Sequence, residues 1–281
     1  MAGSGFCTNF RITTWGETHG AGVGVVVDGC PAGLPLERED VQKYLDRRKP
    51  GQSKYTTQRK EGDQVEILSG IFEGRTTGTP ISMVVYNKDQ RSKDYSNIKD
   101  IYRPGHADFT FDMKYGFRDY RGGGRSSGRE TIGRVAAGAV AAKVLKELGI
   151  EIKAYAKAIA GIEVSKDHFD FAEMNNNPFN MPDKEAAKLV QEKADQMIKE
   201  MDSIGGIIEC QITGMPVGIG ETVFDKLDAE LSKAIMSIGS VKGFEIGDGF
   251  EAANLRGSEN NDDFICVDGK VEKETNHSGG V

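Results

Sequence analysis

The alternation of apolar and polar residues along the chain predicts both strands and helices. Residues 23–28 (VGVVVD) form a short apolar run that ends at glycine and proline residues, which is typical of a strand. Residues 65–71 alternate between apolar and polar side chains and predict a half-buried strand. The apolar run at 81–86 (ISMVVY) is the expected antiparallel partner of that strand.

Apolar residues at helical spacing predict four helices. The second of them begins with a Ser-x-x-Glu pattern, Ser127 to Glu130, which is typical of a capping box, and its apolar stripe continues to Gly149. Because strands and helices come in mixed order, with another strand expected at 204–212, the sequence predicts an α+β fold. The chain shows no internal repeat or linker, so residues 1–281 are expected to form one domain. The predicted helices span residues 36–48, 127–149, 184–201 and 226–238.

Composition indicates a soluble, intracellular protein. With 38% hydrophobic residues, the chain can bury a full core. It has no basic and apolar leader at its N-terminus and no apolar stretch near the roughly 20 residues that a membrane span needs. Its four cysteines are widely spaced and form no Cys-x-x-Cys pair, so neither a disulfide framework nor a zinc site is expected.

The charge of the chain is unevenly distributed. The net charge of −7 argues against a general nucleic-acid binder, yet residues 45–60 carry a local charge of +5 and residues 103–134 carry +3. Two basic segments in an acidic protein favour a focused pocket for a small, highly charged anion. Two solvated basic faces would give the same pattern.

The stretch GGGRSSGRET (122–131) is the clearest candidate for holding an anion. Its glycines lead directly into a predicted helix N-terminus, where free backbone N–H groups and the helix dipole favour negative charge. The alternative is an ordinary capped helix with a flexible entry. Residues 87–126 show little periodicity and predict a long functional loop.

Two histidines stand in settings that suit a general acid. His19 lies in WGETHG (15–20) and His106 in RPGHAD (103–108), each beside glycine and close to an acidic residue. A loop histidine is also common as a surface or hydrogen-bonded core residue, so this alternative stays open for both.

Ordered blocks along the whole chain resemble the chorismate synthase family. That resemblance implies a β-α-β sandwich with helices between two antiparallel sheets, a homotetramer, and a cytoplasmic location without nucleic-acid or membrane partners. It also implies a lyase that converts 5-enolpyruvylshikimate 3-phosphate to chorismate and phosphate by 1,4-anti elimination, with reduced FMN as cofactor. The blocks are WGETHG (15–20) with VDGCPAGLP (27–35), DRRKPG (46–51), RPGHAD (103–108), DYRGGGRSSGRET (119–131) and VKGFEIGDG (241–249).

The resemblance assigns roles by matched position. His19 matches the acid that protonates the departing phosphate, His106 the histidine beside the flavin, and Ser127 a residue implicated in relaying the flavin N5 proton. The matched substrate contacts are Thr18, Arg48, Lys54, Arg103 and Arg129. The matched flavin contacts are His106, Arg125, Ser126, Ser127, Gly239, Ser240 and Gly279.

The sequence also departs from the family pattern. Thr18 replaces a usual serine. Lys54 replaces a frequent arginine, and this replacement keeps the positive charge but loses the bidentate geometry of a guanidinium group. The last residues match the start of a block that continues in the family, so the chain is expected to lack the family's C-terminal flavin loop, an arginine and a catalytic aspartate. Two other functions stay open: an anion-binding module that senses a metabolite without turnover, and an NAD(P)H-driven flavin reductase.

Overall fold

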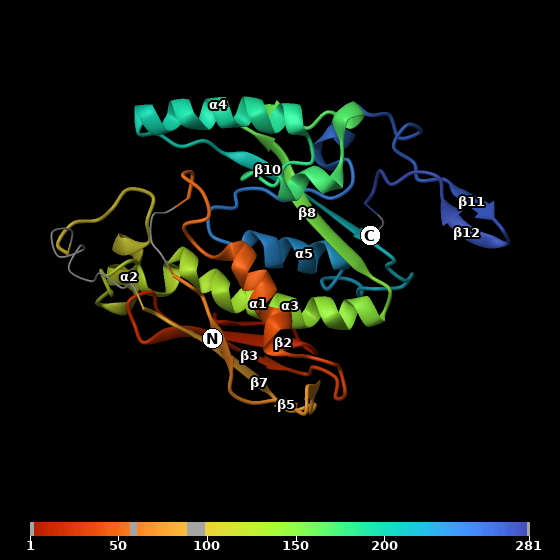
Figure 1. Ribbon diagram of the computed structural model, residues 1–281. Coiled ribbons are helices and arrows are strands. Elements are labelled where there is room, and N and C mark those ends of the chain that lie inside the picture. The colour runs from red at the N-terminus through yellow and green to blue at the C-terminus, as the bar shows by residue number, and fades with distance from the viewer. Residues whose placement is uncertain (1–2, 57–60, 89–98, 280–281) are drawn as a thin grey trace. The chain divides into compact units, whose positions relative to one another are not determined.

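The structure is a computed structural model that describes residues 3–56, 61–88 and 99–279. Its contacts divide the chain into two units, Met1–Met215 and Pro216–Val281 (Figure 1). Each unit has its own elements and is described by itself. The expectation that residues 1–281 form one domain stays a prediction.

A five-stranded antiparallel sheet forms the base of the first unit. Strand β3 is its centre, and the side chains of Val23, Val25 and Val27 are buried in the core. The strands at 22–28 and 81–86 are therefore confirmed, and they pair with each other, Val25 opposite Met83. In spatial order the strands are β1 (Gly5–Phe6), β2 (Arg11–Gly16), β3 (Gly22–Asp28), β7 (Ile81–Tyr86) and β4 (Val65–Ile67).

The strand predicted over 65–71 is interrupted. Of the predicted strand, only residues 65–67 (β4) pair with β7. The residues that follow form a separate hairpin of β5 (Ile71–Phe72) and β6 (Arg75–Thr76). Gly70 lies between them at φ +85°, in the left-handed region that turns the chain out of extended geometry. The alternation of apolar residues correctly predicted extended backbone, but Gly70 divides the segment into two strands, β4 and β5.

Two helices cover one face of this sheet. They are α1 (Arg38–Arg48) and α3 (Thr131–Glu147), and both confirm the predicted helices. Leu45 of α1 and Ile132 of α3 are buried in the same core as the strand residues. Helix α1 begins two residues later than predicted because the Asp40 carboxylate accepts a hydrogen bond from the Glu37 backbone N–H at 3.0 Å.

The capping box predicted before α3 is wrong. Ser127 Oγ accepts a hydrogen bond from the Arg129 backbone N–H at 3.3 Å and starts a 3₁₀ turn, Gly128–Glu130. The Glu130 side chain does not return to this turn. It accepts hydrogen bonds from Thr14 Oγ1 at 2.8 Å and from Arg134 Nε at 2.9 Å, because both donors lie within its reach.

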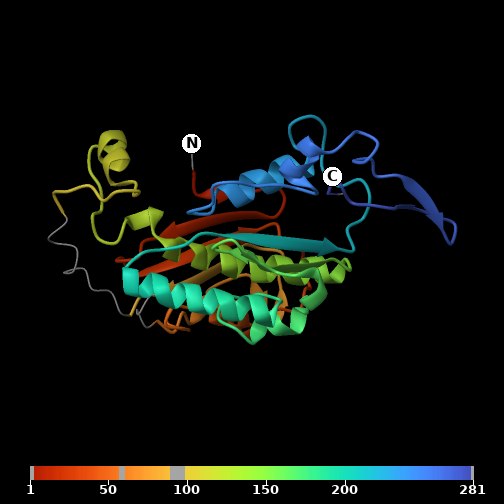
Figure 2. The same ribbon diagram turned by 90° about the horizontal axis from the view of Figure 1, so that it is seen from above.

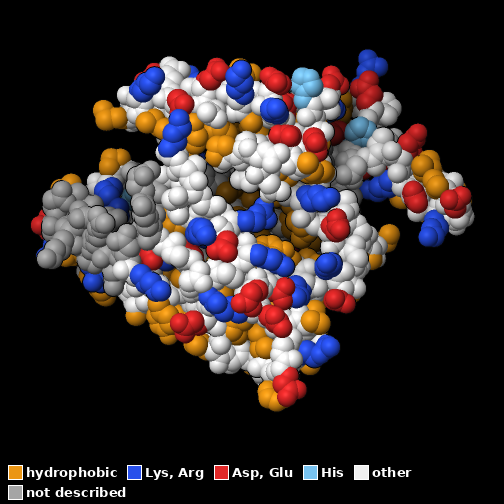
Figure 3. All heavy atoms as spheres, viewed as in Figure 1, with side chains coloured by type: hydrophobic (Ala, Val, Ile, Leu, Met, Phe, Trp, Pro, Cys, Tyr) orange, Lys and Arg blue, Asp and Glu red, His pale blue; other side chains and the backbone are white. Residues whose placement is uncertain are grey.

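A second antiparallel sheet lies on the other side of α1 and α3 (Figure 1). Helix α4 (Lys184–Glu200) packs against it through Ala186 and Val190, which share a core with Ala156. Figure 1 shows α4 on the opposite side of the second sheet from α3, and Figure 2 shows the same elements from above. Figure 3 shows acidic and basic side chains mixed over the outward side of α4. Helices between two antiparallel sheets confirm the expected α+β fold. The second sheet has the order β10 (Gly206–Thr213), β8 (Glu151–Ile159) and β9 (Ile162–Glu163).

The remaining elements include both predicted and unpredicted ones. Within the loop expected at 87–126, the structure forms helix α2 (Asp108–Tyr115), while residues 89–98 lie outside the described residues. The second unit contains the predicted helix as α5 (Leu227–Met236) and an unpredicted hairpin. That hairpin consists of β11 (Phe264–Val267) and β12 (Lys270–Lys273).

Helix α3 approaches the sheet closely at Gly133, and this predicts opposite effects for two glycine substitutions in one helix. A Cβ atom at Gly133 would lie 2.9 Å from Thr14 Cγ2 and 3.0 Å from the Gly24 carbonyl oxygen. We expect Gly133→Ala to lower the free energy of unfolding by about 1–3 kcal/mol, because overpacking outweighs the gain in helix propensity.

Gly138→Ala is the matched control in the same helix. No atom lies within 4 Å of the position of its Cβ, so this substitution is expected to raise the free energy of unfolding by about 0.5–1 kcal/mol. Urea denaturation of both variants measures the difference. Equal stability of the two variants would contradict the close packing of α3.

Candidate active site

The glycine run 122–124 packs its backbone against a histidine. All three glycines have positive φ angles, +66°, +84° and +54°, which other residues rarely adopt. A Cβ atom at Gly122 would lie 2.6 Å from Cδ2 of His19, so only glycine lets the loop approach the imidazole this closely. His19 is buried, with 7% of its surface exposed. The structure thus brings His19 and the glycine run together.

The turn that carries Thr18 and His19 is held by Asn87. Nδ2 of Asn87 donates to the carbonyl oxygens of Glu17 and Gly20, both at 2.9 Å, and Oδ1 accepts from Arg129 Nη2 at 3.1 Å. Thr18 Oγ1 is buried and has no hydrogen-bond partner among the described residues. Such an atom costs free energy unless a ligand or water satisfies it, which makes this turn a suitable wall for a polar ligand.

Arg48 and Arg129 meet at a shared carboxylate. Arg48 Nη1 donates to Oδ2 of Asp63 at 2.7 Å, and Arg129 Nη1 donates to Oδ1 at 3.1 Å. The Asp63 side chain is fully buried, and the Arg129 side chain is 7% exposed. Two of the predicted substrate contacts therefore lie side by side, with a net charge of +1 for the three groups.

Arg103 and His106 belong to a neighbouring cluster at the start of α2. The Asp108 carboxylate accepts hydrogen bonds from Arg103 Nε at 2.9 Å and Nη2 at 3.0 Å, and Arg118 Nη1 lies 3.3 Å away. The bond from Arg103 holds the pKa of Asp108 well below its usual range despite burial. His106 is exposed beside this cluster, and its Nδ1 lies 3.3 Å from the Pro104 carbonyl oxygen.

The cluster at Asp108 also faces the glycine run. The position of a Cβ at Gly123 would be 3.8 Å from Arg103 Nη2, so the start of the basic segment 103–134 lies beside the loop that covers His19. Asp119, just before this run, is held ionised by Arg121, whose hydrogen bond lowers the pKa of the Asp119 carboxyl.

Arg125 fixes the loop to the sheet, and the two serines form hydrogen bonds within the loop. Arg125 Nη2 donates to Thr14 Oγ1 at 2.7 Å, and Nη1 donates to the Gly16 carbonyl oxygen at 3.1 Å. Ser126 Oγ donates to the Gly123 carbonyl oxygen at 2.7 Å, and Ser127 caps the turn before α3. These three predicted flavin contacts all lie on the loop beside Thr18 and His19, and Arg125 also ties this loop to β2.

Lys54 is placed apart from the arginine pair. Its Nζ lies 2.7 Å from Oδ1 of Asp195 on α4, and the Tyr55 hydroxyl donates to the same carboxylate at 2.9 Å. The hydrogen bond from Lys54 lowers the pKa of Asp195. The structure does not bring Lys54 together with Arg48 and Arg129.

The other three predicted contacts belong to the second unit. Ser240 has a φ of +71°, and Gly279 has a φ of +73° and lies against Ile246. Gly239 has no atom within 4 Å of the position of its Cβ. The structure describes these residues within their own unit.

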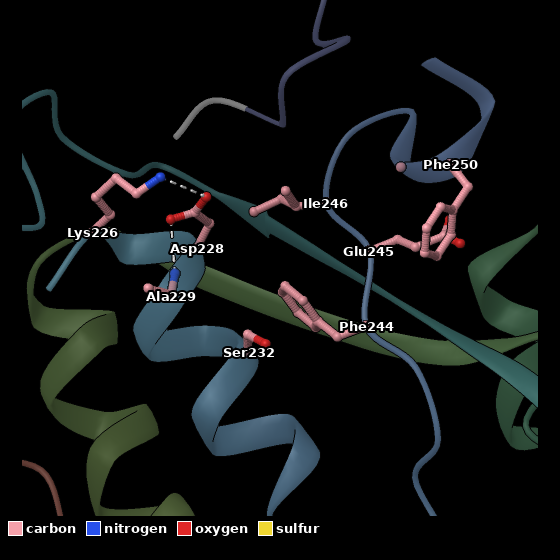
Figure 4. A pocket seen from close by; sticks show the side chains of 9 residues that line it. Lys226, Asp228, Ala229, Ser232, Phe244, Glu245, Ile246 and Phe250 are labelled. Atoms are coloured by element: carbon pink, nitrogen blue, oxygen red, sulfur yellow. Dashed lines mark hydrogen bonds and ion pairs between the residues drawn. The ribbon is translucent and has the colours of Figure 1, made fainter. Parts of the chain in front are cut away.

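The second unit contains a groove of about 430 Å³ between α5 and the segment that follows it (Figure 4). Ser232 and Phe244 face each other across it, and Lys226 pairs with Asp228 at its edge, 3.5 Å apart. It contains none of the predicted site residues. It is lined by Lys226, Asp228, Ala229, Ser232, Phe244, Glu245, Ile246, Gly249 and Phe250.

The sequence analysis missed the polar partners of the predicted site. Asp63, Asn87 and Asp108 hold the arginines in place. Asp108 was noted only as the acidic residue close to His106, and Asp63 and Asn87 stand out neither by spacing nor by composition. The one available signal was the two basic segments, since cations that are buried need carboxylate partners nearby.

Comparison with known proteins gives one consistent result. Residues 10–281 match the profile of the family described as chorismate synthase. Proteins named chorismate synthase from Lachnospira eligens and Agathobacter rectalis are 69% and 64% identical over 281 residues, which are 100% of this chain and 77% of each relative. A crystal structure titled chorismate synthase is 32% identical with a TM-score of 0.82, and the match covers 98% of this chain and 80% of that one.

None of the helices in the described residues has the length and apolar character needed to cross a membrane.

The contacts of Asp108 predict a local loss of stability when its charge is removed. Asp108→Asn keeps the shape but weakens the bonds to Arg103 and Arg118, and hydrogen bonds to charged groups contribute about 1.5–3 kcal/mol each. We expect backbone amide exchange in residues 101–118 to become about tenfold faster or more, measured by hydrogen–deuterium exchange.

The same carboxylate gives an acid dependence with a defined sign. Because folding lowers the pKa of Asp108, its stabilisation is complete above the unfolded value of about 4 and is lost as the pH falls below it. Exchange, corrected for its intrinsic pH dependence, should therefore accelerate below about pH 4 in the unmodified chain and not in Asp108→Asn. Asp112→Asn, which removes one half-exposed ion pair in the same helix, is the control with the smaller effect.

Proposed function

The chain belongs to the chorismate synthase family, whose members are lyases of the shikimate pathway, and from this premise we propose the details of its reaction. It converts 5-enolpyruvylshikimate 3-phosphate to chorismate and phosphate by a 1,4-anti elimination that requires reduced FMN. The observation that carries the proposal is the Arg48–Asp63–Arg129 cluster, which is connected through Asn87 to the turn of Thr18 and His19. A homotetramer in the cytoplasm is part of the same proposal and rests on the family resemblance alone.

The substrate would bind through its negative groups. It carries two carboxylates and a phosphate, and guanidinium groups bind such anions through paired hydrogen bonds. Arg129 supplies a buried cation, Arg48 supplies a partly buried one, and Arg103 supplies a third beside the glycine run. Thr18 Oγ1, buried without a described partner, is available for a substrate oxygen.

His19 would act as the general acid. Departure of the phosphate leaves negative charge on the bridging oxygen, and a proton from a positioned acid stabilises that charge. The burial of His19 under Gly122 excludes water from one face of the imidazole. Asn87 fixes the turn, so the position of the imidazole is coupled to that of Arg129.

The residues on and next to the glycine run are chemically suited to a flavin. The three glycines keep bare backbone at this loop, with Gly122 against His19, and Ser126 and Ser127 of the same loop add hydroxyl groups. His106 adds an imidazole next to Arg103, whose Nη2 is 3.8 Å from the position of a Cβ at Gly123. Reduced FMN, when bound, supplies electron density that assists expulsion of the phosphate and accepts the departing hydrogen. Ser127 and His106 would hold protons near the flavin. Gly239, Ser240 and Gly279 are proposed as flavin contacts on the family resemblance alone.

Turnover with reduced flavin is the direct test of this function. With chemically reduced FMN in the absence of oxygen, we expect the protein, extended to the full length of the relatives it matches, to release phosphate and form chorismate. A phosphate assay and chorismate absorbance measure this. Binding of the substrate without phosphate release would favour a metabolite sensor. Reduction of added FMN by NADPH would show that the protein is also a flavin reductase.

Substitution of His19 and substitution of His106 should have different effects on the reaction. His19→Ala is expected to lower the single-turnover rate of phosphate release by about 10²–10⁴-fold, which is the usual contribution of a positioned acid. His106→Ala is expected to change the absorbance spectrum of bound reduced flavin in the presence of substrate. Stopped-flow absorbance with phosphate detection separates the two effects.

His168→Ala is the control, since His168 is exposed in a 3₁₀ turn before α4. It should retain the unmodified rate and spectrum. If both other variants retained them as well, the assigned roles of His19 and His106 would be wrong.

A further inference from the structure

Asp63 joins Arg129, which is buried, to Arg48, which is partly buried. Each of its oxygens accepts a hydrogen bond from a different guanidinium, Arg48 at 2.7 Å and Arg129 at 3.1 Å. We propose that Asp63 is a positioning residue that sets the spacing and orientation of Arg48 and Arg129 toward the anionic groups of the substrate. The inference rests on the proposed function, because that function assigns both arginines to the substrate.

The need for such a residue follows from charge. Two guanidinium groups brought together repel each other, and burial removes the water that would screen this repulsion. A carboxylate has two oxygens with separate lone pairs, so it can hold both cations at once. A neutral amide has one acceptor oxygen and one donor nitrogen, and the nitrogen would face an N–H group.

The other contacts of Arg48 fix its plane. Nε donates to Thr131 Oγ1 at 3.2 Å, and Nη2 donates to the Gly128 carbonyl oxygen at 3.4 Å. With the bond to Asp63, described residues use three of its five N–H groups. The Arg48 side chain stays 20% exposed, so the rest of the guanidinium can meet a ligand in a defined orientation.

The backbone of Asp63 is adapted to this position. Its φ of +42° lies in the left-handed region, which Asp and Asn adopt more readily than other residues with a side chain. Its carbonyl oxygen accepts a hydrogen bond from Gln42 Nε2 of α1 at 3.2 Å. Asp63→Asn therefore keeps the backbone conformation and tests the carboxylate itself.

A different role for Asp63 would change the affinity for anions in the opposite direction when the carboxylate is removed. If the carboxylate only competed with the substrate for the arginines, its removal would free two cations and strengthen anion binding. If it positions them, its removal weakens binding although the site gains positive charge. The direction of the change in affinity therefore decides between the two roles.

The experiment measures binding and turnover of Asp63→Asn in the whole chain. Titration calorimetry with inorganic phosphate and with 5-enolpyruvylshikimate 3-phosphate should give dissociation constants about tenfold higher or more, as expected when one partner of a buried charge pair is lost. In the reduced-FMN assay KM should rise by a similar factor while kcat changes by less than about threefold. Asp28→Asn is the matched control: its carboxylate binds Arg11 at the same 2.7 Å but is 41% exposed, and it should bind both anions like the unmodified chain.

A second variant and a double-mutant cycle separate positioning from general damage. Asp63→Glu keeps the charge but displaces it by one methylene, and it should also weaken binding. This variant replaces Asp63→Asn in the experiment if circular dichroism shows that the Asn variant does not fold. Arg48→Lys combined with Asp63→Asn should lose less than the sum of the two single losses in binding free energy, because both act on one contact. Additive losses would indicate a structural role and overturn the inference.

The outcomes also distinguish this inference from the proposed function. If the unmodified chain neither binds nor converts the substrate, the proposed function is wrong and the inference fails with it. If the unmodified chain is active and Asp63→Asn binds phosphate and substrate equally well or more tightly, the positioning role alone is wrong.

Discussion

The contact of α3 with strand β2 at Thr14 is the constraint on which the rest of the site depends. The Thr14 methyl lies where only the missing side chain of Gly133 leaves room, and its hydroxyl donates to Glu130 and accepts from Arg125. One buried residue therefore fixes the distance of α3 from the sheet, the first turn of that helix, and the loop before it. Packing and hydrogen bonding act at the same atoms, so none of the three can move alone.

That fixed helix start explains how separate chain segments form one site. Arg129 lies in the turn that leads into α3, so its guanidinium reaches the Asp63 carboxylate and the Asn87 amide at the same time. Arg48 arrives at the C-terminal end of α1, which packs against α3. The turn of His19 connects β2 and β3, and Asn87 follows β7 beside it. The turn of His19 and Asn87 thus come from neighbouring strands of the sheet, and Arg48 and Arg129 come from the ends of two helices.

The sequence predicted the helices and strands in which buried apolar residues recur at the regular spacing of the element. Strand β3 and helices α1, α3, α4 and α5 were all found where apolar residues repeat, and the family blocks indicated the histidines and arginines. The pattern did not predict the break at Gly70, because a turn there depends on backbone angle and not on hydrophobicity. Nor could it pair Glu130 with Thr14 or place Asp63 between two arginines, since those contacts join residues 116, 15 and 66 positions apart. Such pairings are decided by tertiary packing.

The site proposed for a polyanion must be stable before the anion arrives, and the charges of this chain are paired in a way that meets this requirement. Arg48 and Arg129 share one carboxylate and keep an excess of one positive charge. By contrast, Arg103 and Arg118 are balanced by Asp108 and Asp112, and Lys54 is paired with Asp195. Buried cations without such partners would destabilise the fold, and cations fully neutralised would have little attraction for a ligand. Sharing one carboxylate between two guanidinium groups satisfies both requirements. The attraction for the proposed anion then comes from the geometry of the cluster. The number of basic residues in a segment does not determine it, since Lys54 lies in the basic segment 45–60 and is paired with Asp195.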